Sequence, residues 1–172
     1  MFKPISLILS SIASWVSFSQ AAEKNIIFFI TDDESPTLGC YGDPIAKTPA
    51  IDALAKDGTL FENAFATTAS CSASRSVVLS GLHNHANGQY GHQHAFHKFA
   101  SYYNVIGLSL PRAMTAAGYR TGQIGKYHVA PEEVYQFETY LKGNARNAVK
   151  MAEQAKESVS YTHLRAHETY DH

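Results

Sequence analysis

Three short segments of the sequence carry the residues that are best suited to chemistry. The first has two adjacent carboxylates, the second a cysteine and an arginine, and the third a lysine and a histidine. These six residues are Asp32, Asp33, Cys71, Arg75, Lys126 and His128. Ligands of open α/β sheets bind at the carboxyl ends of the strands, and each segment lies at such a position in the expected fold. We therefore expect the three segments to converge on one site.

The Cys71 segment is the most specific of the three. Its sequence predicts that Cys71 opens a helix, where backbone N–H groups and the helix dipole stabilise an anion. Arg75 lies one helical turn further on, so its guanidinium can point at the same place and hold a tetrahedral oxyanion such as sulfate or phosphate. An inert cysteine and a disulfide between Cys40 and Cys71, which an exported protein permits, are the alternatives.

Asp32 and Asp33 indicate a cation site. Adjacent carboxylates in one loop repel each other unless a cation or an arginine holds them. Their hard oxygen atoms favour calcium or magnesium. For this pair alone, a capped and solvated turn explains the sequence equally well.

The residues between these segments predict strands that alternate with helices. Apolar runs indicate strands at 25–31, 59–66 and 119–124. Helices are expected from Pro49 to Gly58, over 71–79, from Leu110 to Gly118 and over about 145–156. This alternation predicts an α/β fold with a parallel sheet, and no repeat or linker marks an internal domain boundary.

The two ends of the chain are set apart from this fold. Residues 1–22 combine a positive Lys3, an apolar stretch and a small-x-small motif ending at Ala21, which predicts a cleaved export signal rather than a membrane anchor. Residues 159–172 have no periodicity and resemble translated adapter or vector sequence, so we interpret them as a non-native tail. The fold is therefore expected within residues 23–158.

The composition excludes few functions. The 172 residues are 45% hydrophobic and 17% charged, as in an ordinary globular protein. A net charge of −1 argues against a nucleic-acid binder, which needs a basic face.

Three motifs, in order along the chain, resemble those of the sulfatase family in the alkaline-phosphatase-like superfamily. Cys71-Ser72-Ala73-Ser74-Arg75 resembles its C-x-[PA]-x-R signature. The pair Asp32-Asp33 after an apolar run resembles its metal-binding pair, and Gly125-Lys126-Tyr127-His128 resembles its G-K-x-H motif. Further residues are most similar to the heparan N-sulfatase (sulfamidase) branch; they are His85, Asn87-Gly88, Tyr90-Gly91, His97, Phe99, Val129 and Pro131-Glu132.

The resemblance implies a mixed, mostly parallel sheet flanked by helices, of which this chain is the truncated N-terminal part. It also implies an exported hydrolase of sulfuric esters or sulfamates on sugars such as heparan-type glycans. The implied partners are this sulfated carbohydrate and a formylglycine-generating maturation enzyme, with no nucleic acid and no stable membrane insertion.

The resemblance also implies a role for each catalytic residue. Cys71 is converted to formylglycine, whose hydrate attacks sulfur with one hydroxyl and later helps to expel sulfate with the other. Arg75 holds the hydrated aldehyde and Lys126 pairs with a sulfate oxygen. His128 orients or deprotonates the diol.

The implied metal is Ca²⁺, with Asp32, Asp33 and the converted Cys71 among its ligands. It would polarise the sulfate oxygens and lower the pKa of the nucleophile. The family's other calcium ligands and a further histidine come from later in its fold, and no matching residues follow Phe137. We therefore expect this stretch to be inactive alone.

The histidine run from His83 to His97 is open to three interpretations. Its H-x-H pairs suit zinc or copper, but no cysteine or carboxylate joins them within the segment. A surface loop explains the run, and so does a loop that lines a polar pocket for a sulfated sugar, because the run directly follows the Cys71 helix.

Two other functions remain open. One is a hydrolase of phosphate or phosphonate esters from the same superfamily. The other is a secreted metal-binding or disulfide module with no catalysis, built on the histidine run and the two cysteines.

Overall fold

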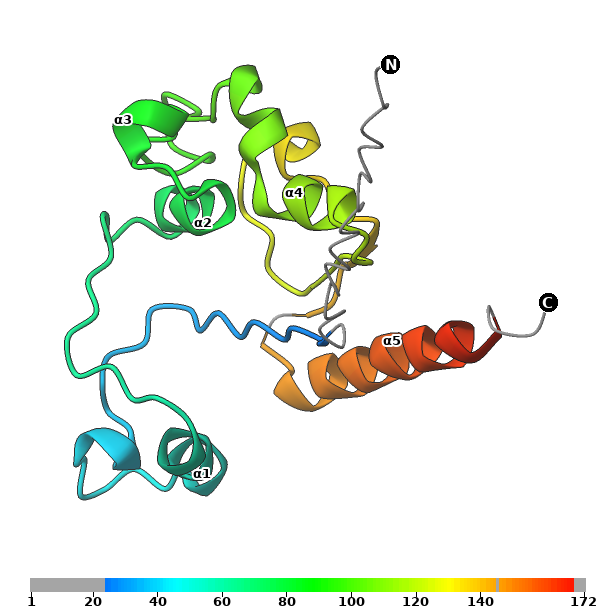
Figure 1. Ribbon diagram of the computed structural model, residues 1–172. Helices are drawn as coiled ribbons and strands as arrows, with labels where there is room; N and C mark the ends of the chain where they lie inside the picture. The colour runs from blue at the N-terminus through cyan, green and yellow to red at the C-terminus, as the bar shows by residue number, and fades with distance from the viewer. Residues whose placement is uncertain (1–23, 145, 169–172) are drawn as a thin grey trace, which may run out of the picture. The chain divides into compact units, whose positions relative to one another are not determined.

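The computed structural model describes residues 24–144 and 146–168, with side chains up to residue 158. The predicted export signal lies outside the described residues. The chain divides into two units, residues 1–31 and 32–172. In chain order, the elements of the second unit are η1 (Gly39–Tyr41), α1 (Pro49–Asp57), α2 (Cys71–Ser80), α3 (Asn84–Asn87), η2 (Tyr103–Leu108), α4 (Leu110–Ala116), β1 (Gly122–Ile124), η3 (Glu132–Tyr135), β2 (Thr139–Leu141) and α5 (Ala148–Glu168), where η marks a 3₁₀ helix (Figure 1).

The first unit does not contain the predicted strand at 25–31. Residues 24–31 run without regular secondary structure, and the Phe29 side chain is 80% exposed. A strand forms only where a neighbour completes its hydrogen-bond ladder. The two strands of the described residues pair with each other, and the apolar run does not belong to their sheet.

The predicted strand at 59–66 is also wrong. These residues form turns and irregular structure, and Phe61 and Phe65 are 67% and 90% exposed. The reason is the same: their β-forming composition is not matched by a neighbouring strand in the part of the chain that the structure describes.

Three predicted helices are confirmed, and each starts where the sequence placed it; α2 runs on to Ser80 and α4 ends at Ala116, before the predicted Gly118. Pro49 begins α1 and Gly58 follows its last residue. Cys71 begins α2, which ends before Gly81 in the left-handed conformation (φ 67°). Pro111 lies at the start of α4, where its missing N–H costs no hydrogen bond.

The sheet consists of two short parallel strands. Gly122, Gln123 and Ile124 of β1 align with Thr139, Tyr140 and Leu141 of β2. The predicted strand at 119–124 is therefore found, although it is shorter. Parallel strands need a crossover connection, and η3 lies within it. Helices with a small parallel sheet confirm the mixed α/β class.

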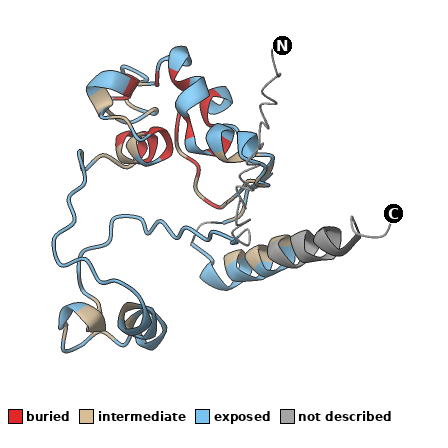
Figure 2. Cartoon of the chain, in the orientation of Figure 1, coloured by how far each residue is buried: buried red, intermediate tan, exposed pale blue. Residues whose placement is uncertain are grey.

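The buried residues gather on α2 and on the segments that contact it (Figure 2). Helix α2 contacts α3 and α4, and η3 contacts both η2 and α4. The apolar core of these segments comprises Leu79, Val105, Tyr127, Val129, Val134 and Tyr135. By contrast, α1 has no buried residue and packs on η1.

Helix α5 begins three residues after the predicted position and runs on to Glu168. It therefore extends into the segment 159–172, whose interpretation as a non-native tail stays a prediction. None of the helices in residues 24–144 and 146–168 has the length and apolar character that crossing a membrane requires.

Candidate active site

The first residue of α2 is Cys71, as the sequence predicts. Ser70 precedes it in an extended conformation, so the helix starts abruptly at the cysteine. The cysteine itself is half-buried, while Ser72, Ala73 and Arg75 behind it are buried. The sulfur atom therefore lies at the positive end of a helix whose other side is fixed in the core.

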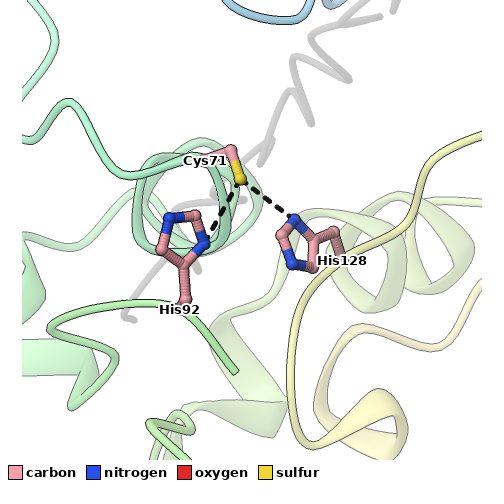
Figure 3. A group of neighbouring side chains, drawn as sticks. All are labelled: Cys71, His92 and His128. Atoms are coloured by element: carbon pink, nitrogen blue, oxygen red, sulfur yellow. Dashed lines mark hydrogen bonds between the residues drawn. The ribbon is translucent and has the colours of Figure 1, made fainter. Parts of the chain in front are cut away.

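Two imidazoles approach the sulfur (Figure 3). The Nδ1 atom of His128 lies 3.1 Å from Cys71 Sγ, and the Nδ1 atom of His92 lies 3.4 Å from it. His128 comes from the segment after β1, and His92 comes from the loop after α3. His128 and His92, which follow Cys71 by 57 and 21 positions in the sequence, thus meet at its sulfur atom.

His128 is held in an unusual position. Its backbone is left-handed (φ 56°), a strained conformation of the kind that gathers at functional sites. Its ring stacks on His94 and His92, with centroids 4.9 and 5.6 Å away. Burial, followed by the charge of Lys126, lowers the pKa of His128 below its ordinary value. The imidazole is therefore neutral near pH 7 and can accept a proton.

In a second group of side chains, Asp32 pairs with the positively charged Lys126 and Arg75. Lys126 Nζ donates to both carboxylate oxygens at 2.7 and 2.8 Å, and Arg75 Nη2 lies 3.5 Å from Oδ1. The guanidinium is also fixed by its Nη1 atom, which donates to the Lys126 carbonyl at 3.0 Å. The hydrogen bond from Lys126 is the main cause of the lowered pKa of Asp32, so this carboxylate stays ionised.

The structure brings five of the six predicted residues into these two groups. Arg75 belongs to the same helix as Cys71, and Lys126 is two residues from His128, so the groups adjoin. Asp33 follows Asp32 in a left-handed conformation (φ 57°) and is exposed. No hydrogen bond or ion pair of Asp33 is seen among the described residues.

His92 is the residue that the sequence did not single out. It lies in a run of histidines whose neighbours are mostly exposed, so spacing alone gave no way to choose it. The one available signal was the position of the run directly after the Cys71 helix. The structure also has both Cys40 and Cys71 as free thiols, so the alternative disulfide is not formed.

A buried polar network fixes the loop that leads to His92. The Asn87 side chain is fully buried, and its Nδ2 lies 3.1 Å from Ser76 Oγ and 3.3 Å from Ser80 Oγ, both on α2. Its Oδ1 accepts a hydrogen bond from the Gln89 N–H at 2.8 Å. The loop is thereby tied to α2 by directional bonds.

The network continues to the segment that carries His128. Ser101 Oγ donates to Gln89 Oε1 at 3.4 Å and lies 2.6 Å from the Tyr135 hydroxyl. The backbone carbonyl of Tyr135 accepts a hydrogen bond from the Tyr127 hydroxyl, next to His128. One set of buried polar groups thus connects the two histidine-bearing segments.

The chain is similar to known sulfatases. The family model described as Sulfatase matches residues 24–171. N-sulphoglucosamine sulphohydrolase of Homo sapiens is 44% identical over 119 residues, which are 69% of this chain and 23% of the relative. Ulvan-active sulfatase of Formosa agariphila is 40% identical, covering 70% of this chain and 23% of the relative.

N-acetylglucosamine-6-O-sulfatase of Bacteroides thetaiotaomicron is 37% identical over 66% of this chain and 19% of the relative. The chain thus spans less than a quarter of the length of these curated relatives. Since the family match extends over all but the first residues, the chain belongs to the sulfatase family.

Proposed function

We propose that this chain carries the nucleophile of a hydrolase of sulfuric esters or sulfamates on sugars. The observation that supports the proposal most directly is the Cys71 sulfur, which lies at the start of α2 and 3.1 Å from a neutral His128 imidazole. A nucleophile with an adjacent base is the arrangement that covalent hydrolysis requires. Membership of the sulfatase family supports sulfur as the atom attacked.

The nucleophile itself is proposed to be formylglycine, made by oxidation of Cys71. Its hydrate supplies a hydroxyl that can attack a sulfate group. His128 then takes the proton of this hydroxyl at Nδ1, the ring atom that faces the Cys71 side chain. The start of α2 favours negative charge at the same position.

Arg75 and Lys126 are proposed to bind the sulfate group. The Arg75 side chain is 9% exposed, so its charge acts in a medium that screens it less than water does. Its bond to the Lys126 carbonyl holds the guanidinium in place before substrate arrives, which is the preorganisation that electrostatic catalysis needs. Lys126, which is 28% exposed, adds a second positive charge.

The carboxylates fit the Ca²⁺ ion that the family implies. Asp32 and Asp33 are adjacent and offer hard oxygen atoms, and the Asp32 carboxylate is 48% exposed and ionised. Calcium takes about six to eight oxygen ligands, so these two residues supply part of the set. When bound, the ion would polarise the sulfate oxygens. Asp32 would then be shared between the ion and the two cationic side chains.

The proposed substrates are sulfated sugars, of N-sulfated or O-sulfated glucosamine type. The names of the human and Bacteroides relatives refer to N-sulphoglucosamine and to N-acetylglucosamine-6-O-sulfate. Release of sulfate from each sugar by the full-length protein distinguishes the two, and an aryl phosphate in the same assay tests the phosphate-ester alternative. Export is proposed from residues 1–22, and N-terminal sequencing of the secreted protein tests it.

The decisive experiment is mass spectrometry after co-expression with a formylglycine-generating enzyme. Trypsin releases Cys71 in the peptide 57–75 and Cys40 in the peptide 25–47. We expect an aldehyde, reactive toward an aminooxy probe, in the first peptide and an unchanged thiol in the second. Cys71→Ala is the matched control and should not react. An intact thiol at Cys71, in cells where the same enzyme converts a known substrate, would refute the proposal.

A further inference from the structure

The unmodified cysteine belongs to a group that can hold a metal different from calcium. Cys71 Sγ and one ring nitrogen each of His92 and His128 all lie within 4.8 Å of one another. In both rings the Nδ1 atom is within hydrogen-bond distance of the sulfur. We propose that, while Cys71 is still a thiol, these three atoms bind a thiophilic divalent cation of the zinc class. One sulfur and two imidazole nitrogens are the donors that zinc prefers, and they differ from the oxygen donors of Asp32 and Asp33.

The distances between the three atoms suit a tetrahedral ion. Zinc bonds of about 2.3 Å to sulfur and 2.0–2.1 Å to nitrogen place these ligands about 3.5 Å apart. The observed sulfur–nitrogen distances are 3.1 and 3.4 Å. A ring nitrogen of His92 lies within 4.8 Å of one of His128. Two imidazole ligands of one zinc ion have their nitrogens about 3.3 Å apart, and the approach falls on the exposed His92 side chain.

His128 is already oriented as a ligand. Its Nδ1 faces the sulfur, while its Nε2 is buried without a hydrogen-bond partner among the described residues. In the tautomer that carries its proton on Nε2, Nδ1 offers its lone pair toward the sulfur. Cation binding then releases the proton of the Cys71 thiol to solvent, and one sulfur–metal and two nitrogen–metal bonds replace three metal–water bonds.

The fourth coordination position is open. His92 is exposed, so water can complete the tetrahedron, as in zinc sites with three protein ligands. His94 is the natural comparison because it stacks on His128 and lies in the same loop, yet it does not belong to the ligand group. It provides a matched control variant.

The cation and the proposed maturation compete for the same sulfur. Conversion to formylglycine removes the sulfur and with it the strongest ligand, so the matured chain loses this site. Zinc on the thiol, in turn, blocks the atom that must be oxidised. This consequence rests on the proposed function, whereas the binding itself does not.

Zinc binding is measured on the chain expressed without a maturation enzyme, by competition with a chromophoric zinc chelator. Co²⁺ in place of zinc should give the sulfur-to-cobalt charge-transfer band of a thiolate ligand. We expect Cys71→Ala and His92→Ala each to weaken binding by at least about tenfold, and His94→Ala to leave it within about twofold. The parent chain in urea controls for binding by scattered histidines.

A protection experiment on the parent chain covers the case in which a variant fails to fold. Zinc should slow alkylation of Cys71, read in the peptide 57–75, and leave Cys40 in the peptide 25–47 unchanged. Equal alkylation of Cys71 with and without zinc, or a Cys71→Ala chain that binds zinc as tightly as the parent, overturns the inference. Neither result bears on whether a maturation enzyme converts Cys71, so the two proposals fail separately.

Discussion

Asn87 offers the sharpest test of how the loop before His92 is held in place. Replacement of Asn87 by leucine keeps the branching of the side chain at Cγ and removes the amide. The fully buried amide bonds two serines of α2, the Leu82 carbonyl at 3.2 Å and the Gln89 N–H at 2.8 Å. Both serine hydroxyls also donate to backbone carbonyls of α2, so they keep a partner after the change.

Asn87→Leu therefore leaves two backbone groups, the Gln89 N–H and the Leu82 carbonyl, without this hydrogen-bond partner. The Gln89 N–H lies in a fully buried residue, and leaving such a group without a partner costs about 1–3 kcal/mol. The Leu82 carbonyl is partly buried and adds a smaller amount. Together we expect the free energy of unfolding to fall by about 2–4 kcal/mol. With a urea dependence of about 2 kcal/mol per molar, the middle of the usual range, the unfolding midpoint falls by about 1–2 M.

Equilibrium urea unfolding, followed by circular dichroism, measures this loss. His85→Leu is the control because His85 is an exposed residue of the same short helix, and it should leave the midpoint within about 0.3 M of the parent. If Asn87→Leu also unfolds within that margin, the buried network does not stabilise the fold and the reasoning is wrong.

Three further outcomes are expected. Gly88→Ala should destabilise the chain by about 1–3 kcal/mol more than Gly81→Ala in urea unfolding. Both glycines have positive φ, but an added Cβ at Gly88 meets an aromatic ring at 2.9 Å and one at Gly81 meets nothing within 4 Å. Burial raises the pKa of Tyr135, so the contribution of this residue to stability should be constant below pH about 10 and fall above it. Tyr135→Phe should remove a late step from the tyrosinate absorbance titration. Asp32→Asn should lower the free energy of unfolding by less than about 1 kcal/mol, because the ion pair with Lys126 is partly exposed. Since the pKa of Asp32 is lowered, this contribution is present above pH about 4 and is lost in acid. High salt should also remove it.

The helices were predictable because their ends are signalled locally. Pro49, Gly58 and Gly81 lie at ends of α1 and α2, and each acts through its own backbone restriction or freedom. The same reasoning placed Cys71 at the first position of a helix and Arg75 one turn later. Local rules were sufficient here because a helix satisfies its hydrogen bonds within its own segment.

The predictions of strands at 25–31 and 59–66 were wrong because a strand forms only when a neighbouring strand supplies its hydrogen bonds. An apolar run rich in Ile and Phe reports that a segment favours burial on a sheet, and it says nothing about which segment pairs with it. Only 119–124 gained a partner among the described residues, through a parallel ladder with β2. The register of that ladder joins residues 17 positions apart, which no local pattern contains.

The part of the site that lies within one helix was predictable, and the part that depends on distant segments was not. The relation of Cys71 to Arg75 is local to one helix and followed from the sequence. The approach of His92 and His128 to the sulfur depends on contacts across 21 and 57 residues. These contacts rest on the buried amide of Asn87 and on Ser101, whose polar side chains gave no sign of burial in the sequence.

The small size of the apolar core explains why polar groups hold the site. Six buried residues form that core, and hydrophobic contact is not directional. Hydrogen bonds fix distance and angle, so the paired groups of this buried network favour one arrangement of the segments it joins. One of its atoms, Gln89 Nε2, has no partner among the described residues. The Asn87 side chain ties the His92 loop directly to α2, whereas His128 is reached through Ser101 and Tyr135. A change at Asn87 should therefore displace His92 from the sulfur more than it displaces His128. Such a variant should bind zinc at the proposed site more weakly while Cys71 stays paired with His128.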